Sequence, residues 1–207
     1  MRNGIVYLVM IGFLITANAF PAAAQEKYSP RQVLAEINLA RTEPLKFAGF
    51  LRDFRERFRG KVYTMPGSKA LVRTSEGTAA VDEAIHFLSH QKPLPPLTWS
   101  DDLAAAAAEL AREQARSGEI GHDSARGSGI RERANHQGIW MEWVGENISY
   151  GPYDPRSMVM HLLIDDGRLD RAHRKNQFDP VFGRAGVSCG PHPRFESVCV
   201  IDFSGGL

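Results

Sequence analysis

The chain has 207 residues, with 25 Lys and Arg against 24 Asp and Glu and a formal net charge of +1. Arg2 is the only charged residue among the first 24, so loss of that segment leaves 24 basic against 24 acidic residues and a formal charge of zero. This balance argues against a nucleic-acid partner or an anionic membrane surface. The length suits one domain of ordinary size with enough apolar residues for a core.

The first 24 residues are typical of a secretory signal peptide. Arg2 supplies the charged start, residues 5–20 are almost wholly apolar, and residues 22–24 are three alanines that suit a cleavage site. A transmembrane anchor is the alternative, but the apolar stretch is short and runs directly into Pro21. We therefore predict a mature chain that begins at Gln25, keeps no membrane anchor, and is secreted or periplasmic.

Helix signals dominate the first half of the mature chain. Ser29 as cap, Pro30 at the first helical position and Gln32 in place for a capping box predict a helix that ends before Pro44. Pro44 can open a second helix, whose apolar stripe continues as far as Phe58.

Residues 60–77 are rich in turn formers and lack periodicity, so they are predicted to be a loop or an insertion. A short helix near residues 81–88 follows. Ser100 then caps an alanine-rich helix from Leu103 to about Ser117, and Gly118 stops it.

The second half carries more strand signals. Residues 127–138 form a basic, turn-rich segment in which Arg131, Arg133 and His136 are expected to be solvated. A short strand is predicted over 144–150, and Asp154 with Pro155 caps a further helix that ends at residues 165–167. Two strand-like runs close the chain. Because strands follow helices and do not alternate with them, the fold class is α+β.

The two cysteines, Cys189 and Cys199, lie in these last two strand-like runs. An oxidising compartment makes their pairing the default expectation, and a bridge across a hairpin fits their positions. Two free thiols buried in a sheet are the alternative. His192 is predicted to lie in the turn between the runs.

Three residues carry the main chemical hypothesis: His122, Glu146 and His173. Neutral imidazole and carboxylate suit zinc and similar divalent ions, so two His and one acid could form a metal site or an acid/base cluster. Alternatively, each His bonds a nearby carbonyl or carboxylate and organises the fold. A serine nucleophile at Ser124 is a poor fit, because no nucleophile-elbow motif is present. His161 is expected to be unrelated to this cluster, and His86, His90 and His136 are surface candidates.

The chain resembles the CAP superfamily, the secreted domain shared by cysteine-rich secretory proteins, antigen 5 and plant pathogenesis-related proteins of group 1. The resemblance is spread over most of the mature chain. It rests on the segments 35–41, 96–103, Gly121-His122, Gly145-Glu146-Asn147-Ile148, His173-Arg174 with Asn176, and 182–187. It implies one CAP (SCP) domain over residues 25–207, of the bacterial secreted type, with an insertion at about 44–93.

What the resemblance implies is a three-layer α-β-α sandwich around a three- or four-stranded antiparallel sheet, with a cavity lined by two His and two acids. His122, Glu146 and His173 stand at three of these positions. The family usually has Glu at the fourth, where this chain offers Asp165 or Asp166, and we assign Asp166 to the metal set. Zinc is the expected ion, with magnesium or calcium as alternatives.

The leading functional hypothesis is a monomeric secreted protein that binds a divalent ion and acts on a ligand or partner by binding it. A lipid, a sterol, a cell-envelope component or a protein is the expected partner. The alternative is a metal-dependent hydrolase of an envelope peptide or ester, with an acid as general base. A third possibility is that the inserted segment carries the interaction.

Overall fold

The computed structural model describes residues 29–65, 70–124, 127–138 and 142–206. The predicted signal peptide, residues 1–24, therefore lies outside the described residues. Within these ranges, no helix has both the length and the apolar character needed to cross a membrane.

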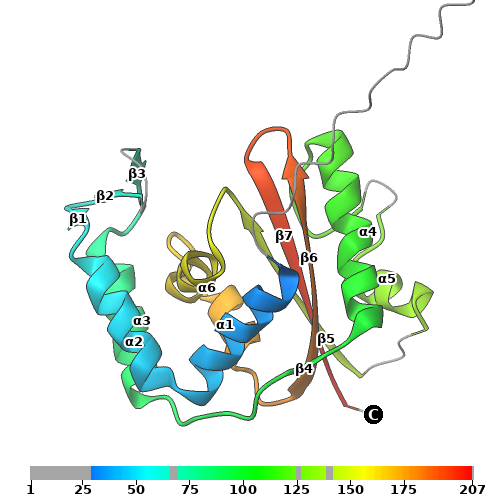
Figure 1. Cartoon of the computed structure of the whole chain (residues 1–207), viewed down its shortest axis with the longest axis horizontal. Coiled ribbons are helices and arrows are strands. Elements are labelled where there is room, and N and C mark those ends of the chain that lie inside the picture. Colours follow the sequence, from blue (N-terminus) through cyan, green and yellow to red (C-terminus); the bar gives the residue numbers. More distant parts are fainter. Residues whose placement is uncertain (1–28, 66–69, 125–126, 139–141, 207) are drawn as a thin grey trace, which may run out of the picture.

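A four-stranded sheet lies at the centre of the molecule (Figure 1). Its strand order is β4 (Thr98–Trp99), β6 (Phe182–His192), β7 (Glu196–Gly205) and β5 (Trp143–Tyr150). The pairs β6/β7 and β5/β7 are antiparallel, as expected. These three strands form the predicted antiparallel sheet, and the two-residue strand β4 is added at its edge in parallel with β6. An extended proline-rich segment brings β4 to the sheet edge in this direction, and the chain then enters the next helix directly.

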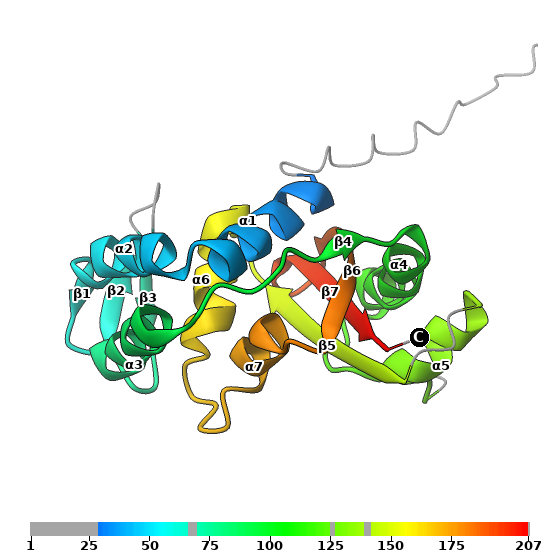
Figure 2. The ribbon, with the colours of Figure 1, turned by 90° about the horizontal axis from the view of Figure 1, so that it is seen from below.

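Helices cover both faces of this sheet, which confirms the three-layer α-β-α arrangement (Figures 1 and 2). One face packs against α4 (Asp101–Ser117) and α5 (Ile130–His136), and the other against α1 (Pro30–Thr42), α6 (Pro155–Ile164) and α7 (Ala172–Phe178). Alternation along β7 explains the two layers. Val198 and Val200 are buried with α4, whereas Ile201 and Phe203 belong to the larger core with α1 and α6.

The predicted helix ends are confirmed where short-range signals set them. Ser29 and Gln32 form the complete capping box of α1, and Ser100 caps α4. Gly118 ends α4 with a left-handed backbone at φ 73°, a conformation that glycine adopts without a Cβ clash.

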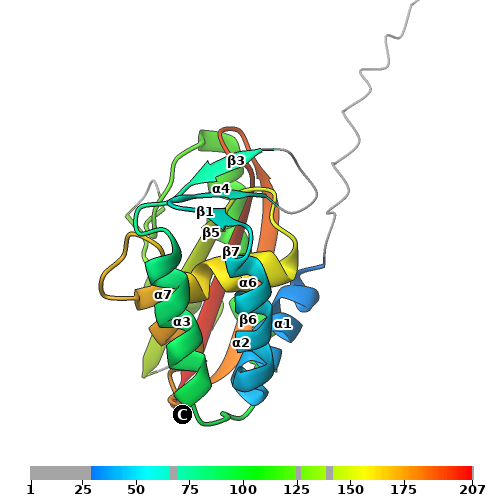
Figure 3. The same ribbon diagram turned by 90° about the vertical axis from the view of Figure 1, so that its left-hand side faces the viewer.

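The segment between Pro44 and Pro93, called the insert from here on, folds as a separate layer at the far end of the molecule from α4 and α5 (Figures 2 and 3). It contains α2 (Pro44–Arg55), α3 (Thr78–His90) and a three-stranded antiparallel sheet of β1 (Phe58–Arg59), β2 (Val62–Thr64) and β3 (Leu71–Arg73).

Residues 60–77, predicted to be a loop or an insertion, are thus not a plain loop, because β2 and β3 lie within them. Strands of two or three residues are too short to show an alternating pattern in the sequence. The small sheet forms because it buries aromatic rings: the ring centroids of Phe58 and Tyr63 lie 5.1 Å apart, and both side chains are buried. Phe58 also lies in β1, beyond the end of α2, and not on the helix stripe.

Cys189 and Cys199 form a disulfide, which confirms their predicted pairing. They lie directly opposite each other in the β6–β7 hairpin. His192, predicted in the turn, is instead the last residue of β6 and is buried, where its ring packs near Tyr150.

Candidate functional site

His122 and Glu146 are in direct contact. Nδ1 of His122 lies 2.8 Å from Oε1 of Glu146, which β5 presents on the face covered by α4 and α5. The His122 side chain is half exposed, whereas that of Glu146 is buried. The loop that carries His122 is anchored to β5 and α4. The hydroxyl of Tyr150 in β5 accepts the Gly121 N–H at 3.0 Å and donates to Gln114 of α4 at 3.0 Å.

Arg133 supplies the positive charge that the buried Glu146 carboxylate requires. Its guanidinium forms an ion pair with Oε2 of Glu146 and donates to the carbonyl oxygens of His122 at 3.0 Å and Ser128 at 2.8 Å. The side chain is fully buried. The prediction that Arg133 is solvated in a loop is therefore wrong: residues 130–136 form α5, and this helix turns Arg133 inward while Arg131 and His136 stay exposed. The role of Arg133 could have been predicted from Glu146, because a glutamate that is buried in a strand needs a nearby cation.

A second acid beneath Glu146 was missed by the sequence analysis. Asp202 of β7 pairs in register with Glu146 across β5 and β7 and is fully buried. Burial, together with the nearby charge of Glu146, raises the pKa of Asp202 well above its usual range. Two acids therefore lie side by side in the sheet, and Arg133 is the buried counter-ion of Glu146. Its role could not be predicted from the sequence, because the contact with Glu146 depends on the pairing of β5 with β7.

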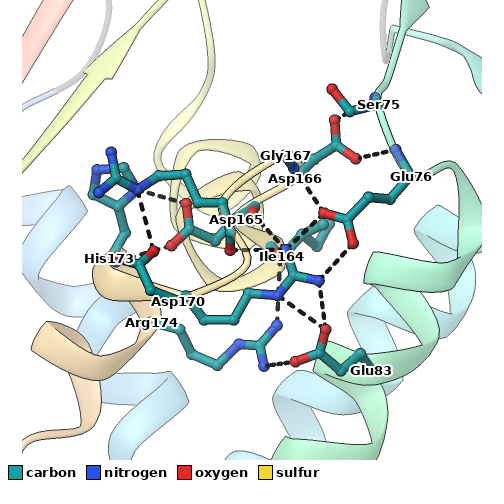
Figure 4. A network of polar contacts seen from close by, with 12 residues as sticks. Ser75, Glu76, Glu83, Ile164, Asp165, Asp166, Gly167, Asp170, His173 and Arg174 are labelled. Atoms are coloured by element: carbon teal, nitrogen blue, oxygen red, sulfur yellow. Dashed lines mark hydrogen bonds and ion pairs between the residues drawn. The ribbon is translucent and has the colours of Figure 1, made fainter.

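His173 forms a similar pair with Asp165 at the start of α7 (Figure 4). Nδ1 of His173 lies 2.7 Å from Oδ1 of Asp165, and Oδ2 accepts the His173 backbone N–H at 2.9 Å. Asp166, which the sequence analysis placed in the metal set, points elsewhere: its carboxylate accepts the N–H groups of Ser75 and Glu76 at 2.6 and 2.8 Å. Asp165, and not Asp166, therefore contacts His173; Asp165 ends α6 with a left-handed backbone.

The two His–acid pairs contact β5 at two consecutive residues, Glu146 and Asn147. Glu146 contacts His122, while the Asn147 side chain donates to the His173 carbonyl oxygen at 2.9 Å. Because successive side chains of a strand point to opposite faces, the pairs approach β5 from its two sides. Within the described ranges, no group of three or more His, Cys, Asp or Glu side chains is arranged to hold a metal ion. Of the four predicted residues, only His122 and Glu146 are in contact, because His173 pairs with Asp165 and Asp166 bonds backbone N–H groups.

A cleft of about 310 Å³ lies beside the His173 pair. Its walls come from β5, α6, the start of α7 and the insert, and its lining includes Tyr63, Tyr153, His161, Asp165 and His173. His122 and Glu146 do not line it. The insert therefore forms one side of this cleft.

His161 was expected to be unrelated to the site, but it lines the cleft and its Nε2 lies 2.9 Å from the Tyr63 hydroxyl. Its ring centroid is 4.2 Å from that of Tyr153. Burial lowers the pKa of His161 to about 4, so the ring is neutral at pH 7. His161 thus lines the cleft as a neutral ring whose Nε2 faces the Tyr63 hydroxyl.

Comparison with known proteins decides the family. Residues 34–203 match the profile of CAP, the cysteine-rich secretory protein family. This chain is a member of the CAP family. No curated protein matches it.

Three solved structures are similar to this CAP protein. An extracellular protein of Bacillus anthracis containing an SCP domain has 19% identity and a TM-score of 0.48, covering 66% of this chain and 47% of its own. An outer surface protein of Borrelia burgdorferi has 16% identity and a TM-score of 0.47, covering 55% and 80%. A cysteine-rich secretory protein of Staphylococcus aureus has 16% identity and a TM-score of 0.40, covering 69% and 54%. The chain thus spans about half the length of the Bacillus and Staphylococcus proteins.

The donor atoms of this CAP protein do not fit the predicted metal site of four protein ligands. Glu146 is already bonded to Arg133 and His122, Asp165 to His173, and Asp166 to backbone N–H groups. A carboxylate at Nδ1 is nevertheless the usual outer partner of a histidine that binds metal through Nε2. The chemistry therefore fits imidazole ligands oriented by Glu146 and Asp165.

Proposed function

We propose that this chain is an exported CAP protein that acts by binding a small amphiphilic ligand of the cell envelope in the cleft beside His173. The observation that carries this proposal is the lining of the cleft, which combines aromatic rings with polar and charged side chains and can therefore contact both the apolar and the polar part of one small molecule. Export is supported by the leader-like first 24 residues and by the Cys189–Cys199 disulfide, since such bonds persist in oxidising compartments.

The lining of the cleft contains two chemically different groups. Phe54, Phe58 and Tyr63, all from the insert, pack against one another and are called the aromatic end, and His173 with Asp165 is called the polar end. Arg73 and Arg168, both exposed, also line it. An elongated ligand with an apolar body and a polar or anionic head matches this distribution.

This arrangement favours binding over hydrolysis. Glu146, the acid that would serve as general base at His122, is buried and held by Arg133. A carboxylate engaged in this way is poorly placed to accept a proton from an attacking water.

Filling the cleft should abolish ligand binding. Val72 of β3 lines the cleft, whereas Leu71 beside it is exposed and does not. We expect Val72→Trp to remove the stabilisation by ligand and Leu71→Trp to retain it, because only the first occupies the cleft. The measurement is the thermal melting temperature with palmitate, cholesterol or muramyl dipeptide as probe. Equal binding by a folded Val72→Trp variant would place the ligand elsewhere, and an unchanged melting temperature of the native protein with every probe would contradict an envelope amphiphile.

A divalent metal is the second candidate ligand, favoured by the carboxylate bonded to Nδ1 of each histidine. Because the two pairs approach β5 from opposite sides, each imidazole would offer its Nε2 to an ion separately, and a bound ion would supply a Lewis acid. The protein's own contribution is to fix the orientation of each imidazole: Glu146 does so for His122, and Asp165 does so for His173.

Zinc titration of the metal-stripped protein by calorimetry tests this second candidate. His86 and His90 require a control, because they are exposed on α3 one turn apart with ring centroids 4.3 Å apart, a spacing that can bind zinc by itself. All titrations are therefore done in a His86→Asn/His90→Asn background. We expect binding there to weaken with His122→Asn or His173→Asn by more than the roughly 10- to 100-fold typical of losing an outer partner. A folded background protein that takes up no zinc would eliminate the metal.

A further inference from the structure

The turn between α6 and α7 and the start of α3 exchange hydrogen bonds in both directions (Figure 4). Asp166 of the turn accepts the N–H groups of Ser75 and Glu76. Glu76 of the insert in turn accepts the Gly167 N–H at 2.7 Å. The same turn presents Asp165 to His173. Two segments about 90 residues apart in sequence are thus tied together at the edge of the cleft.

Arg171 is the centre of this connection. Its guanidinium donates to both carboxylate oxygens of Glu76 at 2.7 Å and to Glu83 at 2.5 and 2.9 Å. It also donates to the carbonyl oxygens of Asp165 at 2.9 Å and Arg168 at 3.0 Å. These bonds from Arg171 lower the pKa of Glu76 to about 2, so both partners are charged at pH 7. Arg171 therefore joins the insert to the backbone of the turn.

Arg174 makes a second connection to the same helix of the insert. It donates to Glu83 at 3.0 Å and to the carbonyl oxygens of Leu163 at 2.5 Å and Ile164 at 3.3 Å, the last residues of α6. The otherwise unpaired carbonyls at the end of α6 are satisfied in this way. Glu83 is thus bonded to both arginines on the side of the turn.

The turn needs such support, because its backbone is strained at two places. Asp165 and Arg171 have φ values of 53° and 49°. Non-glycine residues in this left-handed region cost about 1 kcal/mol or more each, and such conformations persist when the surroundings fix them. The strained residue Asp165 is also the one whose carboxylate holds the ring and the N–H of His173.

We infer that Glu76 and Glu83 of the insert are positioning residues for His173, acting through Arg171, Arg174 and the turn 165–171. The insert then has two effects on the cleft: it forms the aromatic end directly and fixes the imidazole at the polar end indirectly. Only the consequence for ligand binding rests on the proposed function. The ordering of His173 does not.

Hydrogen exchange of the ligand-free protein, followed by NMR, tests the inference. In Glu76→Gln/Glu83→Gln, which weakens the charge-assisted bonds, we expect the His173 amide to exchange at least about tenfold faster, because its acceptor Asp165 is no longer fixed. Amides of the central sheet such as Val200 should keep their protection. Asp82→Asn is the matched control, since Asp82 neighbours Glu83 on α3 but pairs with Arg55 within the insert.

An unchanged His173 exchange rate in the folded double variant would overturn the inference, as would an equal change in Asp82→Asn. If the double variant unfolds, Glu76→Gln alone gives the same comparison, because it weakens the bonds to both Gly167 and Arg171. The outcome is independent of the ligand: failure of every probe to bind would contradict the proposed function and leave the exchange result intact.

Discussion

Replacing Arg133 with Met is expected to lower the free energy of unfolding by about 3–5 kcal/mol, the cost of removing one partner of a buried ion pair. Arg133 is the fully buried counter-ion of Glu146, and Asp202 lies behind the same carboxylate. Methionine fills a similar volume but leaves the Glu146 charge without compensation. It also removes the bonds to His122 and Ser128 that hold the His122 loop. Urea denaturation at pH 7 measures the effect.

Two further variants separate the charge effect from packing. Arg131→Met lies on the same short helix but is exposed, so we expect its effect to stay within about 0.5 kcal/mol. Adding Glu146→Gln to Arg133→Met removes the uncompensated charge and should recover part of the loss. A loss in Arg133→Met no larger than that in Arg131→Met would show that the buried pair contributes little.

Features set by neighbouring residues could be predicted from the sequence. Ser29 with Gln32, Ser100 and Gly118 mark helix ends by bonds within one turn of the chain, and each is found where expected. The Cys189–Cys199 bridge joins residues of one hairpin and required no knowledge of the wider fold. The three-layer architecture was predicted from the family resemblance. Hydrophobic periodicity alone does not predict it.

The site could be predicted only in part, because its geometry depends on contacts between distant segments. Asp165 and Asp166 are adjacent and chemically alike, and the left-handed backbone at Asp165 decides which of them reaches His173. That conformation depends on Arg171 and on glutamates of the insert. Arg133 was assigned to solvent for the same reason, since its burial follows from the docking of α5 on β5 and not from its neighbours.

The insert and the site also proved to be connected. In the sequence analysis, the insert was an addition to the CAP domain and a third candidate for carrying the interaction. In the structure, it contributes the aromatic end of the cleft and carries the carboxylates bonded to Arg171 and Arg174. The binding properties of this chain are therefore expected to differ from those of CAP domains that lack such a segment.

His161 should make stability depend on pH between about 4 and 6.5. Burial lowers its pKa to about 4 in the folded protein, against about 6.5 in the unfolded chain. The unfolded chain therefore binds a proton more tightly, and folding stability falls as the pH drops through this window, by about 3 kcal/mol in total from this residue. Above pH 6.5 the contribution is constant.

The matched comparison is His161→Gln, whose amide can still bond the Tyr63 hydroxyl but does not titrate. Other groups that titrate near pH 4 are common to both proteins, so the difference between their denaturation curves isolates His161. We expect that difference to change by about 3 kcal/mol between pH 7 and pH 4. Parallel pH profiles for His161→Gln and the native protein would show that water reaches the ring, and that the aromatic end of the cleft is open to solvent.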